Sequence, residues 1–236
     1  MKNIKRNHTH QVIAANTEGR DYICGDIHGC YDALMTRLNE VDFSQSCDRL
    51  FALGDIIDRG PDSLMCLRLL KEDWFHCVLG NHEQMMMDVI LTQKPSDFWY
   101  KWGGLWHDKL VASDDIKEVV DLCGEFVSKL PHSITLDDGH GRKVGLVHAE
   151  PVDDWAYAQA DHIDYQSMIW GRDRILNSNP KPVLNIAYVL VGHSTDNHIR
   201  QRANVFYLDT GAGYPQGFLT LVEITKDLRE TLRRDQ

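Results

Sequence analysis

The sequence predicts an α/β fold in which parallel strands alternate with helices, and three observations support this class. Between residues 21 and 91, a short apolar run, a glycine-rich acidic turn and an amphipathic helical stretch follow one another three times. Asp55 follows Asp26 by 29 positions and Asn81 follows Asp55 by 26, which is about the length of one βα repeat. The chain of 236 residues is 43% apolar and 25% charged, as expected for a soluble domain with a core.

Each repeat supplies one strand, one turn and one helix. The strands are expected at 22–24, 50–53 and 75–79, and the helices at 34–41, from Pro61 to Leu70, and at 85–91. The carboxyl ends of neighbouring parallel strands meet at one edge of a sheet, where open α/β sheets bind their ligands. We therefore expect Asp26, Asp55 and Asn81 to occupy equivalent places at that edge.

After residue 133 the pattern changes to β structure. Ser133–Leu136 and Lys143–His148 flank DDGHGR, which predicts a hairpin. Further strands are expected at 188–191, 205–208 and 218–224, and the charged segment that follows is expected to be solvated.

The predicted organisation is one domain with two excursions. Residues 1–20 are interpreted as a tail or an edge strand, and residues 21–236 as a single domain. Segments 92–130 and 149–182 interrupt the regular pattern and are interpreted as cap-like or loop excursions. The first is rich in aromatic residues, typical of a core or a lid, and includes an expected helix from Asp114 to Leu130.

Composition excludes several functional classes. Lys and Arg number 25 against 35 Asp and Glu, so the formal net charge is −10, which argues against non-specific binding to nucleic acid or membranes. There is no apolar run of membrane-spanning length and no secretory signal. The six cysteines are scattered without a CxxC pair, as in reduced proteins, so a cytoplasmic location is expected. The oligomeric state is not predicted.

Polar side chains of metal-binding type follow five of the predicted strands. The five motifs are GDIHG with Asp26 and His28, GDIIDRG with Asp55, Asp58 and Arg59, GNHE with Asn81 and His82, GLVHAE with His148, and LVGHS with His193. A single histidine after a strand is weak support for a site. Five such loops together favour a metal centre.

The donor set also indicates which metals and which substrate to expect. Histidine, aspartate and asparagine without cysteine suit two divalent ions; we expect Mn²⁺, with Fe or Zn²⁺ as alternatives. Two-metal hydrolases hold their ions about 3.5–4 Å apart, and one carboxylate can bridge them. Two ions bring about +4, of which two Asp ligands and a hydroxide remove about 3, so the site would attract a phosphate dianion.

In order and spacing, these motifs resemble the PPP family of metallophosphoesterases. The likeness is greatest to the bacteriophage-lambda-type serine/threonine protein phosphatases, and it extends to GNHEQMM, the WGG segment, DYQSMIWGRDRILNS and YLDTGA. It covers about residues 21–225. The resemblance implies a calcineurin-like metallophosphoesterase αββα sandwich. It also implies a substrate that is a phosphorylated protein or peptide, or a small phosphate ester.

The resemblance further implies a role for each motif residue. One metal ion would take Asp26, His28 and Asp55, and the other Asp55, Asn81, His148 and His193. A metal-bridging hydroxide would attack phosphorus in line. His82 would be the general acid, held by Asp58, while Arg59 and Arg172 would bind phosphate oxygens.

Two positions depart from the family pattern. The family usually has an arginine before GNHE, where this chain has Leu79, and the lambda-type enzymes tend to have asparagine where this chain has Trp102. CVLGNH also resembles the symmetrical diadenosine tetraphosphatases, so hydrolysis of dinucleotide polyphosphates is the alternative activity. A metal-bound module without catalysis is a third hypothesis, although no expected ligand or acid is missing.

Overall fold

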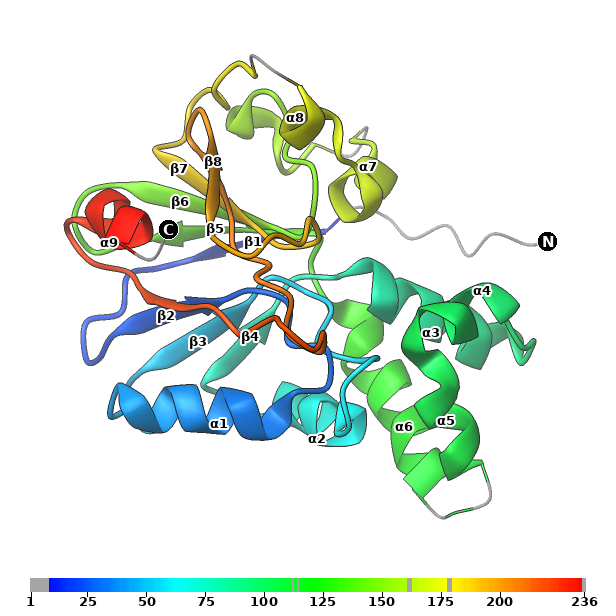
Figure 1. The fold of residues 1–236 in the computed structure, drawn as a ribbon. Coiled ribbons are helices and arrows are strands. Elements are labelled where there is room, and N and C mark those ends of the chain that lie inside the picture. The colour runs from blue at the N-terminus through cyan, green and yellow to red at the C-terminus, as the bar shows by residue number, and fades with distance from the viewer. Residues whose placement is uncertain (1–8, 112, 114, 161–162, 178–179, 235–236) are drawn as a thin grey trace.

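Two β-sheets pack face to face, and helices cover their outer faces (Figure 1). The computed structural model describes residues 9–111, 113, 115–160, 163–177 and 180–234. The sandwich confirms the predicted fold class. No helix within those residues is both long and apolar enough to cross a membrane.

The four-stranded sheet contains the three predicted βα repeats. Strands β2 (Asp21–Cys24), β3 (Arg49–Ala52) and β4 (Phe75–Cys77) are parallel neighbours, and β10 (Leu221–Glu223) pairs antiparallel with β2. The helices that follow the parallel strands are α1 (Tyr31–Glu40), α2 (Ser63–Arg68) with a short 3₁₀ turn η1 (Leu69–Lys71), and α3 (Asn81–Thr92). Helix α2 begins two residues later than predicted, because Pro61 still belongs to the turn after β3.

The six-stranded sheet has the order β1-β5-β6-β7-β9-β8. Its strands are β1 (His10–Ile13), β5 (Ser133–Asp137), β6 (Lys143–Val147), β7 (Tyr188–Val191), β8 (Arg200–Arg202) and β9 (Val205–Tyr207). Strands β5 and β6 form the expected antiparallel hairpin, and β1 pairs in parallel with β5 at the sheet edge. Residues 1–8 of the expected tail lie outside the described residues.

Both faces of the central strands are buried, which explains why they are apolar without interruption. Tyr22 and Cys24 point to the helices, whereas Ile23 between them points to the other sheet. The inter-sheet core also includes Leu228 and Leu232 of the C-terminal helix α9 (Leu228–Arg234), both fully buried. The expectation that this charged end is solvated is therefore wrong for its apolar face.

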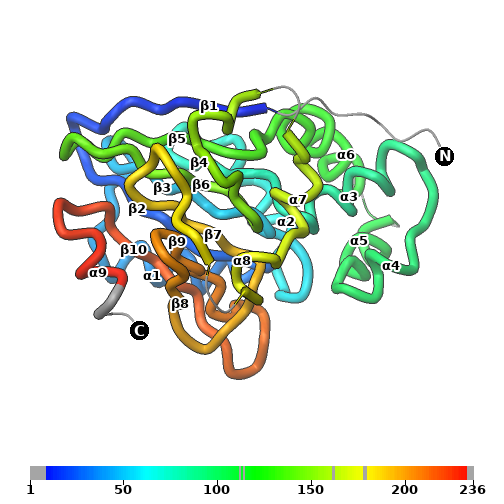
Figure 2. The backbone as a smooth tube through the Cα atoms, turned by 90° about the horizontal axis from the view of Figure 1, so that it is seen from above, coloured from blue at the N-terminus to red at the C-terminus, as the bar shows by residue number. Residues whose placement is uncertain are grey.

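The two excursions are mostly helical. Segment 92–130 forms α4 (Asp97–Trp99), a π-type turn η2 (Tyr100–Gly104), α5 (Leu105–Leu110), α6 (Asp115–Glu125) and a 3₁₀ turn η3 (Val127–Lys129). Segment 149–182 forms a 3₁₀ turn η4 (Trp155–Tyr157), α7 (Tyr165–Trp170) and α8 (Asp173–Leu176). The expected helix start, Asp114, lies outside the described residues. Figure 2 shows α3 to α6 together at one end of the molecule and α9 at the other.

Candidate active site

Loops from both sheets meet at one end of the sandwich. Parallel pairing of β2, β3 and β4, and of β6 with β7, places the carboxyl ends of these strands together. The side chains that the family resemblance assigns to metal ions extend from these ends and are all buried: Asp26, His28, Asp55, Asn81, His148 and His193.

The backbone in these loops is strained. Nine non-glycine residues in the described part of the chain have positive φ angles, and five of them belong to the motifs: His28, Asp55, Asp58, Arg59 and His193. Each such conformation costs about 1–3 kcal/mol and persists only where its surroundings enforce it. The strain therefore concentrates where side chains must be turned toward a common point.

Asp55 lies at the centre of this cluster. Its Oδ2 is 3.8 Å from Nε2 of both His28 and His82, and its Oδ1 is 3.4 Å from Nε2 of His148. Two groups of donors therefore share Asp55: His28, Asp55 and His82 in one, and Asp55, His148 and His193 in the other. One carboxylate in contact with two donor groups is the arrangement that a bridged pair of ions requires.

Hydrogen bonds through Nδ1 anchor two of the histidine rings of the cluster. His28 donates Nδ1–H to the Ile57 carbonyl at 3.0 Å, and His148 donates Nδ1–H to the Leu53 carbonyl at 2.7 Å. The Nε2 atoms face the cluster, where that of His148 lies 2.9 Å from Asn81 Oδ1 and that of His28 contacts Arg59. A metal ion at either ring would take Nε2 in place of these contacts. The buried Nε2 of His193 has no hydrogen-bond partner within the described residues. Because buried polar atoms rarely stay unsatisfied, this nitrogen fits a bound cation.

The pKa values of His28, His193 and Asp26 also suit cation binding, whereas for His148 the Asp55 carboxylate outweighs burial and raises the pKa to about 10. Burial lowers the pKa of His28 and lowers that of His193 to about 3, so both rings are neutral donors. Burial raises the pKa of Asp26, and the neighbouring Asp209 carboxylate adds to this effect. A cation would reverse this penalty for Asp26, because it favours the charged carboxylate.

Asp26 and His82 both lie near His28. Asp26 Oδ2 is 3.8 Å from His28 Nε2, and its two oxygens accept the backbone N–H of His193 at 3.1 Å. His82 belongs to the donor group with His28 and Asp55, although the family resemblance assigns it proton transfer rather than metal binding. Geometry alone is compatible with either role for His82.

A second carboxylate holds the His82 ring from the other side. Asp58 is fully buried, and its Oδ2 lies 2.5 Å from His82 Nδ1. Burial opposes protonation of His82, but the carboxylates of Asp55 and Asp58 outweigh it and raise the pKa of the ring. A protonated ring with its Nε2 facing the cluster can donate a proton there.

Two arginines border the cluster. Arg59 contacts Nε2 of His28 and lies 3.2 Å from Nε2 of His82, while its guanidinium lies 4.9 Å from the centre of the Tyr214 ring. Arg172 donates to the backbone carbonyl of His193 at 3.2 Å. Both guanidinium groups are therefore within reach of an anion bound at the histidines.

Reasoning from sequence missed the role of Glu83. Its buried carboxylate accepts the backbone N–H groups of Asp55, Ile56 and Gly80, at 2.8, 2.9 and 3.1 Å. It thereby fixes the turn that carries Asp55 against the start of α3. The GNHE motif includes Glu83, but the sequence does not indicate which distant backbone amides its side chain binds.

The aromatic excursion also contributes to the site, which sequence reasoning did not foresee. The indole N–H groups of Trp99 and Trp106 both donate to the Asp58 carboxylate. Of the two departures from the family pattern, Leu79 is fully buried in the apolar core. Trp102 is 44% exposed and packs against Phe98, whose ring lies 6.1 Å from that of Trp170.

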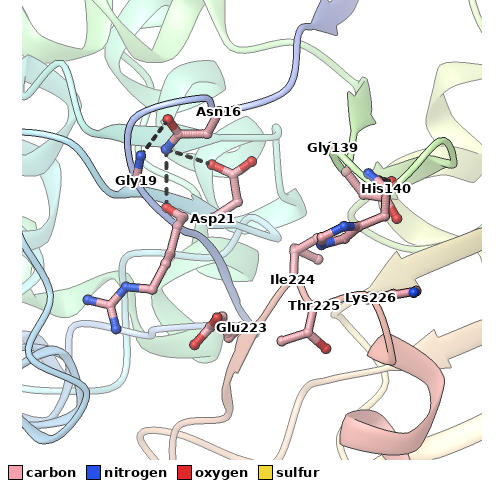
Figure 3. Close-up of a pocket in the computed structure, with 11 residues that line it drawn as sticks. Asn16, Gly19, Asp21, Gly139, His140, Glu223, Ile224, Thr225 and Lys226 are labelled. Carbon is pink, nitrogen blue, oxygen red and sulfur yellow. Dashed lines mark hydrogen bonds between the residues drawn. The ribbon is translucent and has the colours of Figure 1, made fainter.

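A pocket at the opposite end of the sheets is separate from this cluster. Figure 3 shows this cavity of about 420 Å³ between the start of β2, the β5–β6 turn and the end of β10. Two of the charged side chains in its lining are paired, Arg20 with Asp48 and Asp21 with Arg49, both at 2.7 Å. Nothing in its lining points to a ligand.

Comparison with known proteins gives a consistent result. The calcineurin-like phosphoesterase family model matches residues 21–228. Serine/threonine-protein phosphatase 2 of Salmonella typhimurium is 39% identical over 194 residues, which are 81% of this chain and 87% of that protein. A symmetrical bis(5'-nucleosyl)-tetraphosphatase of Shewanella sp. is 40% identical over 105 residues, but these are only 42% of this chain and 35% of that protein.

Solved structures share the fold. A protein serine/threonine phosphatase from Saccharomyces cerevisiae superposes with a TM-score of 0.67 at 15% identity, covering 93% of this chain and 78% of that one. A structure described as a diadenosine tetraphosphatase gives 0.60 at 25% identity, covering 90% of this chain and 93% of that one.

Proposed function

The chain belongs to the calcineurin-like phosphoesterase family and is a phosphatase, and we propose that its substrates are proteins carrying phosphoserine or phosphothreonine. The observation that carries this proposal is the pair of buried donor groups that share Asp55. The choice of phosphoprotein rests on the relative that matches across 81% of this chain and bears a serine/threonine phosphatase name.

Two divalent ions would be held by the residues around Asp55. We propose Asp26, His28 and Asp55 for one ion and Asp55, Asn81, His148 and His193 for the other, with Mn²⁺ favoured by the donor types. When bound, the ions supply the positive charge that activates water and neutralises phosphate oxygens. The unsatisfied Nε2 of His193 and the two Nδ1-anchored rings support this assignment.

The chain's own residues would orient the ester and transfer a proton. Arg59 and Arg172 would bind phosphate oxygens, and the contacts of the two guanidinium groups with His82 and with the His193 carbonyl support these roles. His82 would protonate the leaving oxygen from Nε2, while Asp58 on Nδ1 holds the ring and stabilises its charge. His82 as acid and Asp58 as its partner thus have separate tasks on opposite sides of one ring.

We further propose that residues 21–236 form one domain in which segments 92–130 and 149–182 border the site. The family match over 21–228 supports the first part, and the contacts of Trp106 and Arg172 with site residues support the second. A cytoplasmic location agrees with the net charge of −10 and with free cysteines throughout.

Removal and return of metal tests the proposed activity. The chelated protein should show no turnover of p-nitrophenyl phosphate above background, and added Mn²⁺ should restore it, because the water and the phosphate oxygens need the cations. The measurement is kcat before and after chelation, with Mn²⁺ in buffer alone as the control. A chelated protein of full activity, or one that no divalent metal reactivates, would contradict the proposal.

Hydrolysis of dinucleotide polyphosphates is the second candidate, and Leu79 favours it. The family's arginine is absent at this position and the leucine side chain is buried, so one phosphate-binding charge is missing. We expect kcat/KM to be larger for a phosphoserine peptide than for diadenosine tetraphosphate, since Arg59 and Arg172 suffice for one phosphoryl group. Both substrates should be assayed with the same Mn²⁺-loaded sample. A larger value for the dinucleotide would transfer the assignment to the second candidate.

A further inference from the structure

The Asp58 carboxylate has an unusual set of partners. It is fully buried, and three side-chain N–H groups from different segments surround it. His82 Nδ1 and Trp99 Nε1 reach Oδ2 at 2.5 and 2.7 Å, and Trp106 Nε1 reaches Oδ1 at 2.6 Å. Because burying a carboxylate without hydrogen-bond donors is strongly disfavoured, these three N–H groups stabilise Asp58 in this place.

The backbone of segment 92–130 brings these two indoles to Asp58. Gly103, between them in sequence, has a φ angle of 119°, a conformation that side-chain-bearing residues rarely adopt. A Cβ atom at Gly103 would lie 2.7 Å from the backbone nitrogen of Arg59. The backbone of this segment therefore packs closely against the turn that carries Asp58. The two indole rings are 6.3 Å apart and nearly perpendicular, and they donate to different oxygens of the carboxylate.

We propose that Trp99 and Trp106 are positioning residues for the general acid, acting on His82 through Asp58. This inference rests on the proposed function of His82 as the proton donor. The indoles fix the orientation of the Asp58 carboxylate, and Asp58 in turn fixes the plane of the His82 ring. The segment 97–110 is then part of the proton-transfer apparatus and not only a cover over the core.

The chemical step that would depend on the Trp–Asp58–His82 contacts is cleavage of the ester bond. As the P–O bond to the leaving group breaks, the electron pair goes to the leaving oxygen, and the proton on His82 Nε2 moves to that oxygen; water supplies the new oxygen on phosphorus and returns a proton to the site. Esters with a poor leaving group need this proton, whereas 2,4-dinitrophenolate leaves without it. A misoriented His82 ring should therefore slow the hydrolysis of esters with a poor leaving group more than that of 2,4-dinitrophenyl phosphate.

The test is Trp106→Phe, which removes the N–H donor and keeps an aromatic ring at a half-buried position. With Mn²⁺ at saturation, we expect kcat for phenyl phosphate to fall about tenfold or more, because general acid catalysis contributes about 10²–10⁴-fold and depends on alignment. The kcat for 2,4-dinitrophenyl phosphate should change by less than about threefold. Trp99→Phe should give the same selective loss.

Two controls separate positioning from general damage. Trp74→Phe removes a buried indole N–H that has no hydrogen-bond partner among the described residues, so it should leave the ratio of the two kcat values unchanged. In an Asp58→Asn background, Trp106→Phe should have no further effect on that ratio, because the link to His82 is already broken.

The outcomes distinguish failure of the positioning role from failure of the proposed function on which it rests. Equal losses for both esters, or no loss for either, in Trp106→Phe would overturn the positioning role while wild-type activity stood. A selective loss that persists at full size in the Asp58→Asn background would also overturn it. Failure of the metal-loaded wild type to hydrolyse either ester would instead overturn the proposed function.

Discussion

Asp55→Asn is expected to lower kcat by about 10³-fold or more and to reduce the bound metal below that of the wild type. The amide is neutral and presents an N–H₂ group toward the rings of His28 and His148, whose Nε2 atoms lie 3.8 and 3.4 Å from the carboxylate. Loss of charge stabilisation worth several kcal/mol corresponds to a rate factor of about this size. Steady-state kinetics on p-nitrophenyl phosphate and elemental analysis of metal per chain would check both parts.

A matched control is Asp32→Asn, which makes the same chemical change at an exposed position in the first turn of α1. It should keep the metal content and activity of the wild type. If Asp55→Asn also retained its metal and stayed within tenfold of wild-type activity, Asp55 would not be the shared ligand, and the proposed metal centre would have to be abandoned.

His82→Asn is the second large effect, and it decides between the two roles open to this ring. We expect kcat for phenyl phosphate to fall by about 10²–10⁴-fold, the usual contribution of a general acid, with metal content unchanged. The loss should be much smaller for 2,4-dinitrophenyl phosphate, whose leaving group needs no proton. His82 lies 2.5 Å from Asp58 but 3.8 Å from Asp55, so we expect removal of the ring to impair proton transfer more than metal binding.

For this variant, His198→Asn is the control, because His198 is exposed and its ring contacts its sequence neighbours Asn197 and Asp196. A His82→Asn protein that had lost one metal equivalent and hydrolysed both esters equally slowly would show that His82 is a ligand. The assignment of Asp26 beside His28 would then have to be reconsidered.

Much of the fold could be predicted because its signals are local. The three βα repeats follow from apolar runs broken by glycine-rich turns, and the structure confirms β2, β3 and β4 as parallel neighbours. The hairpin of β5 and β6 follows from the turn residues between them. In contrast, α9 was misjudged because its charged residues outnumber Leu228 and Leu232, which fill the inter-sheet core.

The candidate site could be predicted in its composition but only partly in its contacts. The strand-end motifs identified the residues around Asp55, since strand ends converge in a parallel sheet. The partners of Asp58 could not be predicted beyond His82, because Trp106 is 48 positions away and belongs to an excursion without a regular pattern. Similarly, the residues that flank Glu83 in the sequence do not indicate that it binds the amides of Asp55 and Ile56.

The sequence by itself determined the α/β class, the three βα repeats and the set of candidate side chains for metal and phosphate binding. These properties follow from patterns within a few residues: short apolar runs, glycine at a turn, and polar side chains where a strand ends. Only the tertiary structure decided that two indoles hold Asp58, that Leu79 is buried, and that Asp26 and His82 both lie beside His28. Such contacts depend on how distant segments pack together, and packing is a property of the whole chain that no local pattern encodes.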